Sequence, residues 1–478
     1  MRGHDGAGRI MTPTRKNDTA PVELAAPPVR LLAFRRDRLE RPLLAWGSRF
    51  STGYAVLLPI VRHGKNEAGD HTLDRAGAPA SPARRETARP ETQMRPHAKL
   101  ASSIRRSGIR EIMDLAAGKP DVLHLEVGEP DFLTPAHVMK AADEAARAGF
   151  TKYTPNKGLL EVRESLAAKL ERRNGITANP EQIVVSCGAV NSLATTVAAL
   201  LDPDDAVLIP DPSWPNYEMM IRARHAVPVH YPLSRSTGFQ PDLEELERLA
   251  AETPAAKAIF VNSPSNPTGA VFPTDVIQRI LEVAQRHDLY VISDDVYEDI
   301  VFDGSPPPVP GCFDRDGRVV SIFSASKSYA MTGWRIGYLA ANPELANTIA
   351  KLQEAMTSCA SSVSQKAAQA AIDGDQGCVE EMRRAYARRR DLAVDLLGES
   401  GILAARPQGA FYVMCDVSST GKSGLEFARS LLTEHGVAVA PGETFGPGGS
   451  QMVRASLAAA DDVIREGLTR IIRATRES

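Results

Sequence analysis

Between Ile183 and Ala340 the sequence alternates short apolar stretches with amphipathic ones, and this alternation constrains the fold more than any other feature. Apolar strands that alternate with amphipathic helices indicate a mainly parallel sheet covered by helices on both faces. We predict seven strands, at Ile183–Ser186, Ala206–Pro210, Val227–Tyr231, Lys257–Val261, Leu289–Ser293, Val319–Phe323 and Gly337–Ala340. Helices are predicted between several of them, at Gly188–Leu201, Trp214–Arg224, Leu243–Ala251 and Pro273–His287.

The segment after the sixth predicted strand carries the most informative side chains. Lys327 stands there between small hydroxyl residues, and Arg335 follows eight positions later. Hydroxyls and arginine are good phosphate donors, and a lysine can form an imine with a carbonyl compound. Because ligands of parallel sheets bind beyond the carboxyl ends of the strands, this segment predicts a site for a phosphorylated aldehyde, pyridoxal phosphate. The alternative is a loop lysine and an arginine paired with a surface carboxylate.

The flanking segments indicate a second, smaller α+β domain. Before the sheet we predict helices at Ile104–Leu115, at Thr134–Ala148 with Thr134 as N-cap, and at Leu159–Arg173, with a strand at Val122–Val127. After it we predict one long helical stretch from just after Asn342 to about Ile372 and another at Val379–Leu397, and strands at Ala410–Asp416, Gly436–Ala440 and Gln451–Leu457. The expected division is a small domain of residues 98–140 and 376–478 and a large domain of residues 141–375.

Residues 1–97 differ from the rest of the chain. They are rich in Arg, Pro, Ala and Gly and show no sustained periodicity, which is typical of disorder. A second interpretation is that the working protein starts at Met94, just ahead of the first amphipathic segment. A targeting peptide is the third interpretation, although the acidic residues count against it.

Composition narrows the class of protein. The net charge of −3 gives no basic field for nucleic acid. The five cysteines are scattered and never spaced C-x-x-C, so we expect a reducing compartment and no structural metal. The longest apolar run near the N-terminus, at Tyr54–Val61, is too short to span a membrane. We therefore expect a cytoplasmic protein without nucleic-acid or membrane partners.

From about Ala98 to Arg476 the chain resembles class I aminotransferases of the fold-type I pyridoxal phosphate enzymes, most closely the aspartate-aminotransferase-like branch. Six motifs in order carry the resemblance: VGEPDF at Val127–Phe132, YTPNKG at Tyr153–Gly158, NSPSNPTG at Asn262–Gly269, SDDVYE at Ser293–Glu298, SKSYAMTGWRIGY at Ser326–Tyr338 and QGAFYV at Gln408–Val413. The resemblance implies an α/β fold with a mainly parallel seven-stranded sheet in the large domain, pyridoxal 5'-phosphate as cofactor and a homodimer.

The resemblance also assigns the catalytic residues. Lys327 would bind the cofactor aldehyde and, once freed by the substrate amine, act as general base and acid. Asp294 would face the pyridine nitrogen and keep it protonated. Its neighbour Asp295 points to the opposite side if the strand alternates regularly. Tyr297 and Asn266 would hydrogen-bond the 3-oxygen of the cofactor.

The remaining cofactor contacts are implied in the same way. Ser324, Ser326 and Arg335 would hold the phosphate, together with the backbone amides of Ala189 and Val190 in the turn after Gly188. Trp214 would stack on the pyridine ring. Tyr153 would reach the phosphate in the partner subunit.

For the substrate, the resemblance implies that Arg454 binds the α-carboxylate in a bidentate fashion. Gly128 would lie beside it, with Glu129–Phe132 on a mobile lid. Trp214 and Asn266 would also border the substrate.

The chain departs from the aspartate-preferring members at one position. Those members resemble one another in a lysine just after the glycine of the phosphate turn, where this chain has Val190. Valine cannot pair with a distal carboxylate, so we expect a neutral amino donor unless another cation, such as Lys157, reaches the site.

The predicted function is transfer of an amino group from an L-amino acid to a 2-oxo acid by a ping-pong mechanism. The alternatives are a pyridoxal phosphate-dependent lyase on the same scaffold and an aminotransferase-like effector sensor. The sensor would need a DNA-binding module, and residues 1–97 show no helix-turn-helix pattern.

Overall fold

The structure of the chain is a computed structural model, and it describes residues 95, 97, 98, 100, 107–304 and 306–477. Most of the predicted disordered extension, residues 1–97, and the alternative start at Met94 lie outside these residues, so both interpretations stay predictions. No helix in the described residues is long and apolar enough to cross a membrane.

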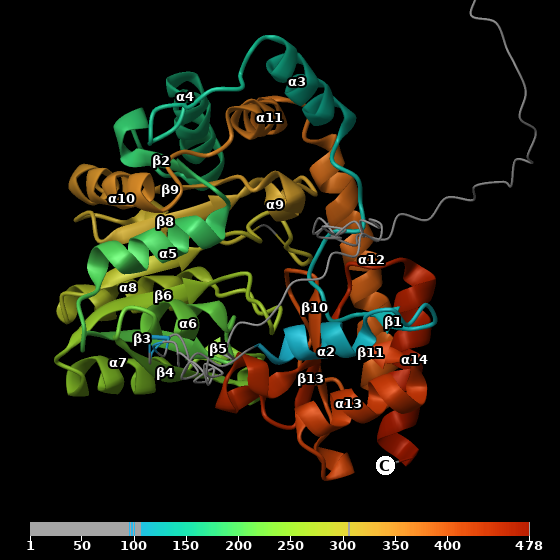
Figure 1. Ribbon diagram of the computed structural model, residues 1–478. Helices are drawn as coiled ribbons and strands as arrows, with labels where there is room; N and C mark the ends of the chain where they lie inside the picture. Colours follow the sequence, from blue (N-terminus) through green and yellow to red (C-terminus); the bar gives the residue numbers. More distant parts are fainter. Residues whose placement is uncertain (1–94, 96, 99, 101–106, 305, 478) are drawn as a thin grey trace, which may run out of the picture. The chain divides into compact units, whose positions relative to one another are not determined.

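A mixed sheet of eight strands forms the centre of the larger part of the fold (Figure 1). In spatial order they are β2 (Ile183–Ser186), β9 (Gly337–Ala340), β8 (Val319–Ser324), β7 (Tyr290–Asp294), β6 (Ala256–Asn262), β3 (Ala206–Asp211), β4 (Val227–Ser234) and β5 (Gln240–Pro241). Neighbours from β4 to β8 run parallel, whereas β9 is antiparallel to both of its neighbours. The predicted mainly parallel sheet is confirmed, with all seven predicted strands present.

The eighth strand, β5, escaped prediction because its two residues are too few to show a period. It pairs antiparallel with the end of β4. All residues of β2 and β9 are buried, as expected for strands covered on both faces. Parallel pairing brings the carboxyl ends of β6, β7 and β8 to one edge of the sheet, with Asn262 opposite Asp294 and Asp294 opposite Ile322.

Nine helices accompany this sheet in the described part of the chain. They are α3 (Ala136–Arg147), α4 (Leu160–Lys169), α5 (Ala189–Leu200), α6 (Asn216–Arg222), α7 (Leu243–Glu252), α8 (Thr274–Arg286), α9 (Ala325–Ser328), α10 (Pro343–Met356) and α11 (Ser362–Asp373). The helical stretch predicted to run to Ile372 is wrong as one helix, because the backbone turns left-handed at Ser358 (φ 64°). The amide of Ser358 donates back to Gln353 O and ends α10.

The second part of the fold is α+β, as predicted. It contains a three-stranded antiparallel sheet and a two-stranded parallel one around a core that includes Phe411, Phe427 and Ile464. Its elements are β10 (Tyr412–Asp416), β13 (Met452–Ser456), β12 (Ala440–Pro441), β1 (Leu123–His124), β11 (Val437–Ala438), α2 (Gly108–Ala116), α12 (Gly377–Glu399), α13 (Gly424–His435) and α14 (Asp461–Glu477).

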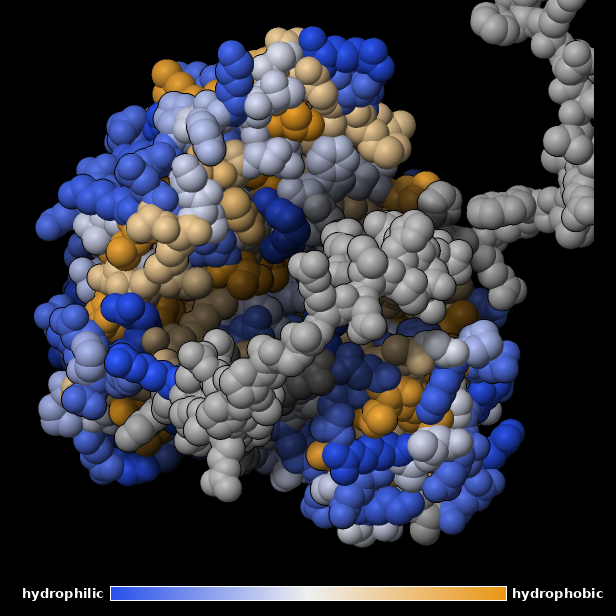
Figure 2. All heavy atoms as spheres, viewed as in Figure 1, coloured by the Kyte–Doolittle hydropathy of each residue, from blue (hydrophilic) through white to orange (hydrophobic). Residues whose placement is uncertain are grey.

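Local sequence explains the best-defined of these helices. Helix α13 begins with a capping box, in which Ser423 and Glu426 bond each other's backbone, and ends at Gly436 with φ 65°. The predicted domain boundaries stay predictions, and the one at residue 140 falls inside α3, which packs on α11. Figure 2 shows mainly hydrophilic side chains over the helices at the margins of this view, with smaller apolar patches between them.

Candidate active site

A pocket of about 350 Å³ lies beyond the carboxyl ends of β6, β7 and β8, where the large sheet meets β10 and β13. Every predicted site residue except Gly188 and Tyr153 lines it. Those that line it are Gly128, Ala189, Val190, Trp214, Asn266, Asp294, Tyr297, Ser324, Ser326, Lys327, Arg335 and Arg454. The topology therefore brings together residues that are more than 300 positions apart in the sequence.

Gly188 does not line the pocket, but it shapes the wall. Its φ of 84° is left-handed, and a Cβ there would lie 2.6 Å from Nη2 of Arg335. Helix α5 starts at the next residue, so the first amides of its N-terminus, from Ala189 and Val190, have no partner within the helix. Ser324 and Ser326 stand on the neighbouring turn, where their hydroxyl oxygens lie 2.9 Å apart. Together these donors form a concave, electropositive corner suited to an anion.

Asp294 ends β7 and is buried at the floor of the pocket. Its Oδ2 accepts a hydrogen bond of 2.6 Å from the hydroxyl of Tyr217, whereas its Oδ1 is buried and has no partner in the described chain. Burial raises the pKa of Asp294 to about 6, against the hydrogen bond from Tyr217. Asp295 lies outside the lining and accepts from Ser293 Oγ at 2.7 Å, so the alternation places the two carboxylates as expected.

Lys327 projects from α9, and its Nζ donates to the carbonyl oxygen of Gly128 at 2.6 Å. Burial lowers the pKa of this amine to about 8; the nearby Glu129 opposes this, while Arg454 and Arg335 add to it. An amine with a pKa near 8 is partly neutral at physiological pH and can act as a base.

Arg454 enters from β13 and is only 2% exposed. Its Nη1 donates to Asn266 Oδ1 at 2.8 Å and its Nη2 to Glu126 O at 2.5 Å, while its buried Nε has no partner. Its guanidinium lies 4.2 Å from the ring centre of Tyr412. The arrangement leaves a buried cation with a free donor at the edge of the pocket.

Two tyrosines of the site were missed by sequence reasoning. Tyr217 stands three residues after Trp214, in the first turn of α6, and that spacing was the only available signal. Tyr412 lies within the QGAFYV motif; its hydroxyl is 2.8 Å from that of Tyr297, and a Cβ on Gly128 would collide with it. Also missed were two apolar lining residues of α2, Ile109 and Met113, which share a helix face at i, i+4.

Some predicted residues lie apart from this group. Tyr153 is 89% exposed and outside the pocket. The conditional prediction that Lys157 reaches the site is wrong, because its Nζ donates to the backbone carbonyl of Glu181 at 2.7 Å and to its carboxylate at 3.2 Å. Trp214 does line the pocket and packs edge to face on Tyr217, with ring centres 5.6 Å apart.

The predicted lid segment is anchored at both ends. Asp131 accepts two hydrogen bonds of 2.8 and 2.7 Å from the guanidinium of Arg389, and Glu129 accepts one from Thr332. The ring of Phe132 packs edge to face on Tyr386. Mobility of this segment stays a prediction.

Comparison with known proteins agrees with this geometry. Residues 120–471 match the family model described as aminotransferase class I and II. The aromatic-amino-acid aminotransferase 2 of Thermococcus litoralis is 37% identical over 378 residues, covering 78% of this chain and 96% of that protein. The arginine–pyruvate transaminase of Pseudomonas aeruginosa is 38% identical over 355 residues, covering 73% of this chain and 89% of that protein.

A solved structure is similar over the same region. The Thermus thermophilus aspartate aminotransferase single mutant 1 superposes with a TM-score of 0.76 at 37% identity, covering 80% of this chain and 100% of that one. These three proteins are named for three different kinds of amino acid, aromatic, arginine and aspartate, at 37–38% identity to this chain. The chain belongs to the class I and II aminotransferase family, and it is an enzyme that transfers amino groups between small molecules.

Proposed function

We propose that the chain is a pyridoxal 5'-phosphate-dependent aminotransferase that works by a ping-pong mechanism with a neutral L-amino acid as donor. The observation that carries the proposal is the buried, unpartnered Oδ1 of Asp294 in the same pocket as the buried amine of Lys327. A buried acceptor without a partner is costly unless a ligand supplies a donor. The protonated ring nitrogen of the cofactor is such a donor.

The other polar groups of the pocket fit the remaining parts of the cofactor. Ser324, Ser326, Arg335 and the first amides of α5 would hold its phosphate, and the glycine at 188 leaves room for the guanidinium. Trp214 would cover its ring, and Asn266 and Tyr297 would bond its 3-oxygen. When bound, pyridoxal phosphate supplies an aldehyde that takes up the amino group and a ring that withdraws electrons from the α carbon of the substrate.

The protein side chains divide the remaining work. Arg454 would bind the substrate α-carboxylate through its free Nε and an Nη, a bidentate contact that fixes the α carbon. Lys327 Nζ would remove the proton from that carbon, and its lowered pKa provides the neutral amine. Asp294 would hold a proton on the ring nitrogen. The Glu129–Phe132 segment would exclude water when closed.

The lining of the pocket supports a neutral donor. Its cations among the described residues are Lys327, Arg335 and Arg454, and each has a role already. Lys157 is bonded to Glu181, and Val190 occupies the position expected for a carboxylate-binding lysine. Ile109, Met113 and Val190 present apolar surface instead. An alanine, aromatic, branched or sulfur-containing donor matches this surface better than aspartate.

The active enzyme would be a cytoplasmic homodimer with active sites at the subunit interface. Tyr153 is 89% exposed and is therefore free to contact a partner subunit. In such a dimer Tyr153 of one subunit would reach the phosphate bound by the other.

A half-reaction scan tests the proposal. Purified protein with bound pyridoxal phosphate is mixed with single L-amino acids, and the visible absorbance of the cofactor is followed. We expect rapid change with neutral donors, formation of the 2-oxo acid, and little change with aspartate. Fast change with aspartate would overturn the substrate assignment, and release of ammonia in place of transfer would indicate a lyase.

A further inference from the structure

Thr134 does not cap the helix that follows it. We predicted its hydroxyl as the N-cap of α3, but α3 begins at Ala136 without a side-chain cap. Instead, Thr134 Oγ1 donates to the carbonyl oxygen of Ala330 at 2.7 Å and accepts from Trp334 Nε1 at 3.0 Å. The hydroxyl therefore bonds a segment 196 to 200 residues further along the chain.

The two groups that Thr134 binds stand at opposite ends of one loop, residues 330–334, which joins α9 to Arg335. Ala330 and Arg335 both have a φ of 50°, so the backbone is left-handed at each end of the connection. This conformation is uncommon for residues other than Gly, Asn and Asp, and it persists only where the surroundings enforce it. The hydroxyl of Thr134 is one such constraint, because it bonds the backbone carbonyl of Ala330 at one end and the indole side chain of Trp334 at the other.

The side chain of Arg335 has few other supports. Its Nη1 donates to Thr332 O at 2.8 Å, which lies in the same loop, and its Nη2 lies 3.5 Å from Cys187 O. Both of these partners are backbone carbonyls, and the residue is exposed. The position of Arg335 thus depends on the shape of the loop.

The groups that face the rest of the pocket are held by other elements. Lys327 Nζ is bonded to Gly128 O, and Asp294 is bonded to Tyr217 on α6. Thr332 of the loop also donates to Glu129, the neighbour of Gly128, so of these two contacts only that of Asp294 with Tyr217 is free of the loop. A relaxed loop would move the guanidinium directly, because Arg335 follows the loop in the chain.

We infer that Thr134 is a positioning residue that fixes Arg335 relative to Lys327 and thereby sets the affinity of the site for a phosphate group. The inference rests on the proposed function, since it assigns Arg335 to the cofactor phosphate. It gives the threonine that follows the lid segment a role in anion binding, although it does not line the pocket itself.

The test compares two ligands that differ only in the phosphate. Apoenzyme of wild type, Thr134→Val and Thr134→Ser is titrated with pyridoxal phosphate and with pyridoxal, and both dissociation constants are measured by absorbance. Valine keeps the branched shape and removes the hydroxyl. Thr469→Val is the matched control, because the hydroxyl of Thr469 also donates to a backbone carbonyl, Arg465 O at 2.8 Å, on the exposed side of α14.

We expect Thr134→Val to raise the dissociation constant of pyridoxal phosphate about tenfold and that of pyridoxal by less than about twofold. A tenfold change corresponds to about 1.4 kcal/mol of binding free energy. Thr134→Ser should restore most of the affinity, and Thr469→Val should change neither constant. Trp334→Phe removes the indole donor and keeps a ring. It should also raise the dissociation constant of pyridoxal phosphate relative to that of pyridoxal, and it replaces Thr134→Val in the test if that variant does not fold.

An equal rise in the dissociation constants of both ligands would overturn the inference, because it would show that Thr134 has a general structural role. Unchanged binding of pyridoxal phosphate in a folded Thr134→Val protein would overturn it as well. A wild-type protein that binds pyridoxal phosphate no better than pyridoxal overturns the proposed phosphate site itself, which is a distinct result.

Discussion

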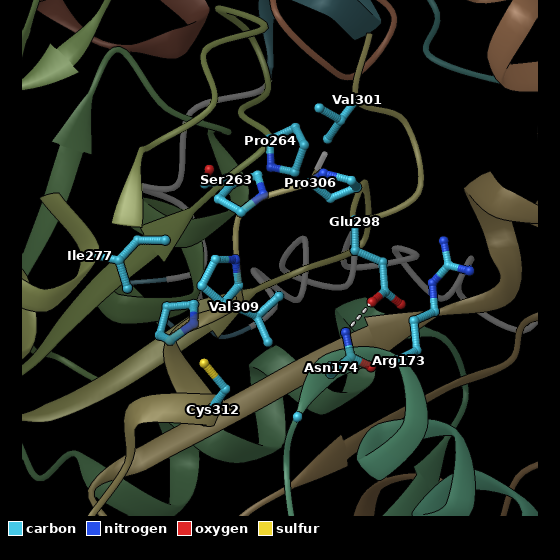
Figure 3. Close-up of a pocket in the computed structure, with 14 residues that line it drawn as sticks. Arg173, Asn174, Ser263, Pro264, Ile277, Glu298, Val301, Pro306, Val309 and Cys312 are labelled. Carbon is cyan, nitrogen blue, oxygen red and sulfur yellow. Dashed lines mark hydrogen bonds between the residues drawn. The ribbon is translucent and has the colours of Figure 1, made fainter. Parts of the chain in front are cut away.

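Two pockets adjoin the segments at the ends of β6 and β7, and they differ in whether their buried charged groups have partners within the protein. Neighbouring residues in the sequence line different pockets. Asn262 and Tyr297 line the candidate active site, whereas Ser263 and Glu298, the residues that follow them, line the second pocket. The second pocket has the larger volume, about 510 Å³ against about 350 Å³. Figure 3 shows Arg173, Asn174 and Glu298 on one side of it and Pro264, Pro306 and Val301 on another.

Charges in the second pocket are already paired within the protein. Arg173 contacts the carboxylate of Asp299, and Glu298 accepts hydrogen bonds of 2.5 Å from both Lys169 and Asn174. In the active-site pocket, Asp294 Oδ1 and Arg454 Nε are buried without a partner. Two unpaired buried groups thus face the active-site pocket, whereas the charged side chains that line the second pocket, Arg173 and Glu298, are paired within the protein.

Replacing Lys327 with alanine should have the largest effect, and it tests whether the active-site pocket carries out the reaction. Loss of the proton-transfer group should lower the transfer rate by roughly 10²- to 10⁴-fold, measured as 2-oxo acid formed per second. Lys157→Ala is the control, because Lys157 is bonded to Glu181 outside the pocket. Near-normal activity in Lys327→Ala would remove Lys327 from the mechanism.

Replacing Lys169 with methionine tests the second pocket. Glu298 would be left buried without its ion-pair partner, which should lower the free energy of unfolding by roughly 3–5 kcal/mol. The change is measured by denaturant titration. Lys140→Met, which removes a lysine 3.7 Å from Glu144 on the surface of α3, should cost less than about 1 kcal/mol. A similar loss of unfolding free energy in both variants would show that the buried contact of Lys169 with Glu298 does not stabilise the fold.

Replacing Tyr217 with phenylalanine removes the hydrogen bond that favours ionised Asp294. The pKa of Asp294, already raised to about 6 by burial, should rise further. Activity needs the ionised form, so the acid limb of the pH–rate profile should move to higher pH. A hydrogen bond to a charged group contributes roughly 1.5–3 kcal/mol, which corresponds to about one to two pH units.

Tyr231→Phe provides the control for that profile. The hydroxyl of Tyr231 is equally buried, but it donates to Phe260 O, 2.8 Å away, and the residue does not line the pocket. If the acid limb of the pH–rate profile lies at the same pH in both variants, the hydroxyl of Tyr217 does not control the ionisation of Asp294.

Replacing Val190 with lysine should have the smallest effect, and it tests the preference of the active-site pocket for a neutral amino donor. A half-exposed new ion pair is worth about 1 kcal/mol, so kcat/KM for aspartate relative to alanine should rise roughly fivefold. Val190→Met has a similar length and no charge, and should leave the ratio unchanged. An unchanged ratio in Val190→Lys would mean that position 190 does not contact the distal carboxylate.

Local patterns determined much of the fold and of the candidate site. The seven strands from Ile183 to Ala340 were predictable because each is an apolar run with its own boundaries. Lys327, Asp294 and Arg335 were found because they stand in short motifs just past those strands. Alternation predicted that Asp294 and Asp295 point to opposite sides, and the choice of Asp294 came from the resemblance, in which the functional aspartate stands three residues before the tyrosine.

Only the tertiary structure decided which distant groups bond to one another. The sequence offered Lys157 as a possible second cation, but its amine is bonded to Glu181; it offered Thr134 as a helix cap, but the hydroxyl bonds Ala330 and Trp334. The contacts of Tyr217 with Asp294 and of Tyr412 with Tyr297 span 77 and 115 residues. Motif and period act over a few residues, whereas a hydrogen bond depends on which surfaces the packed chain brings within 3 Å.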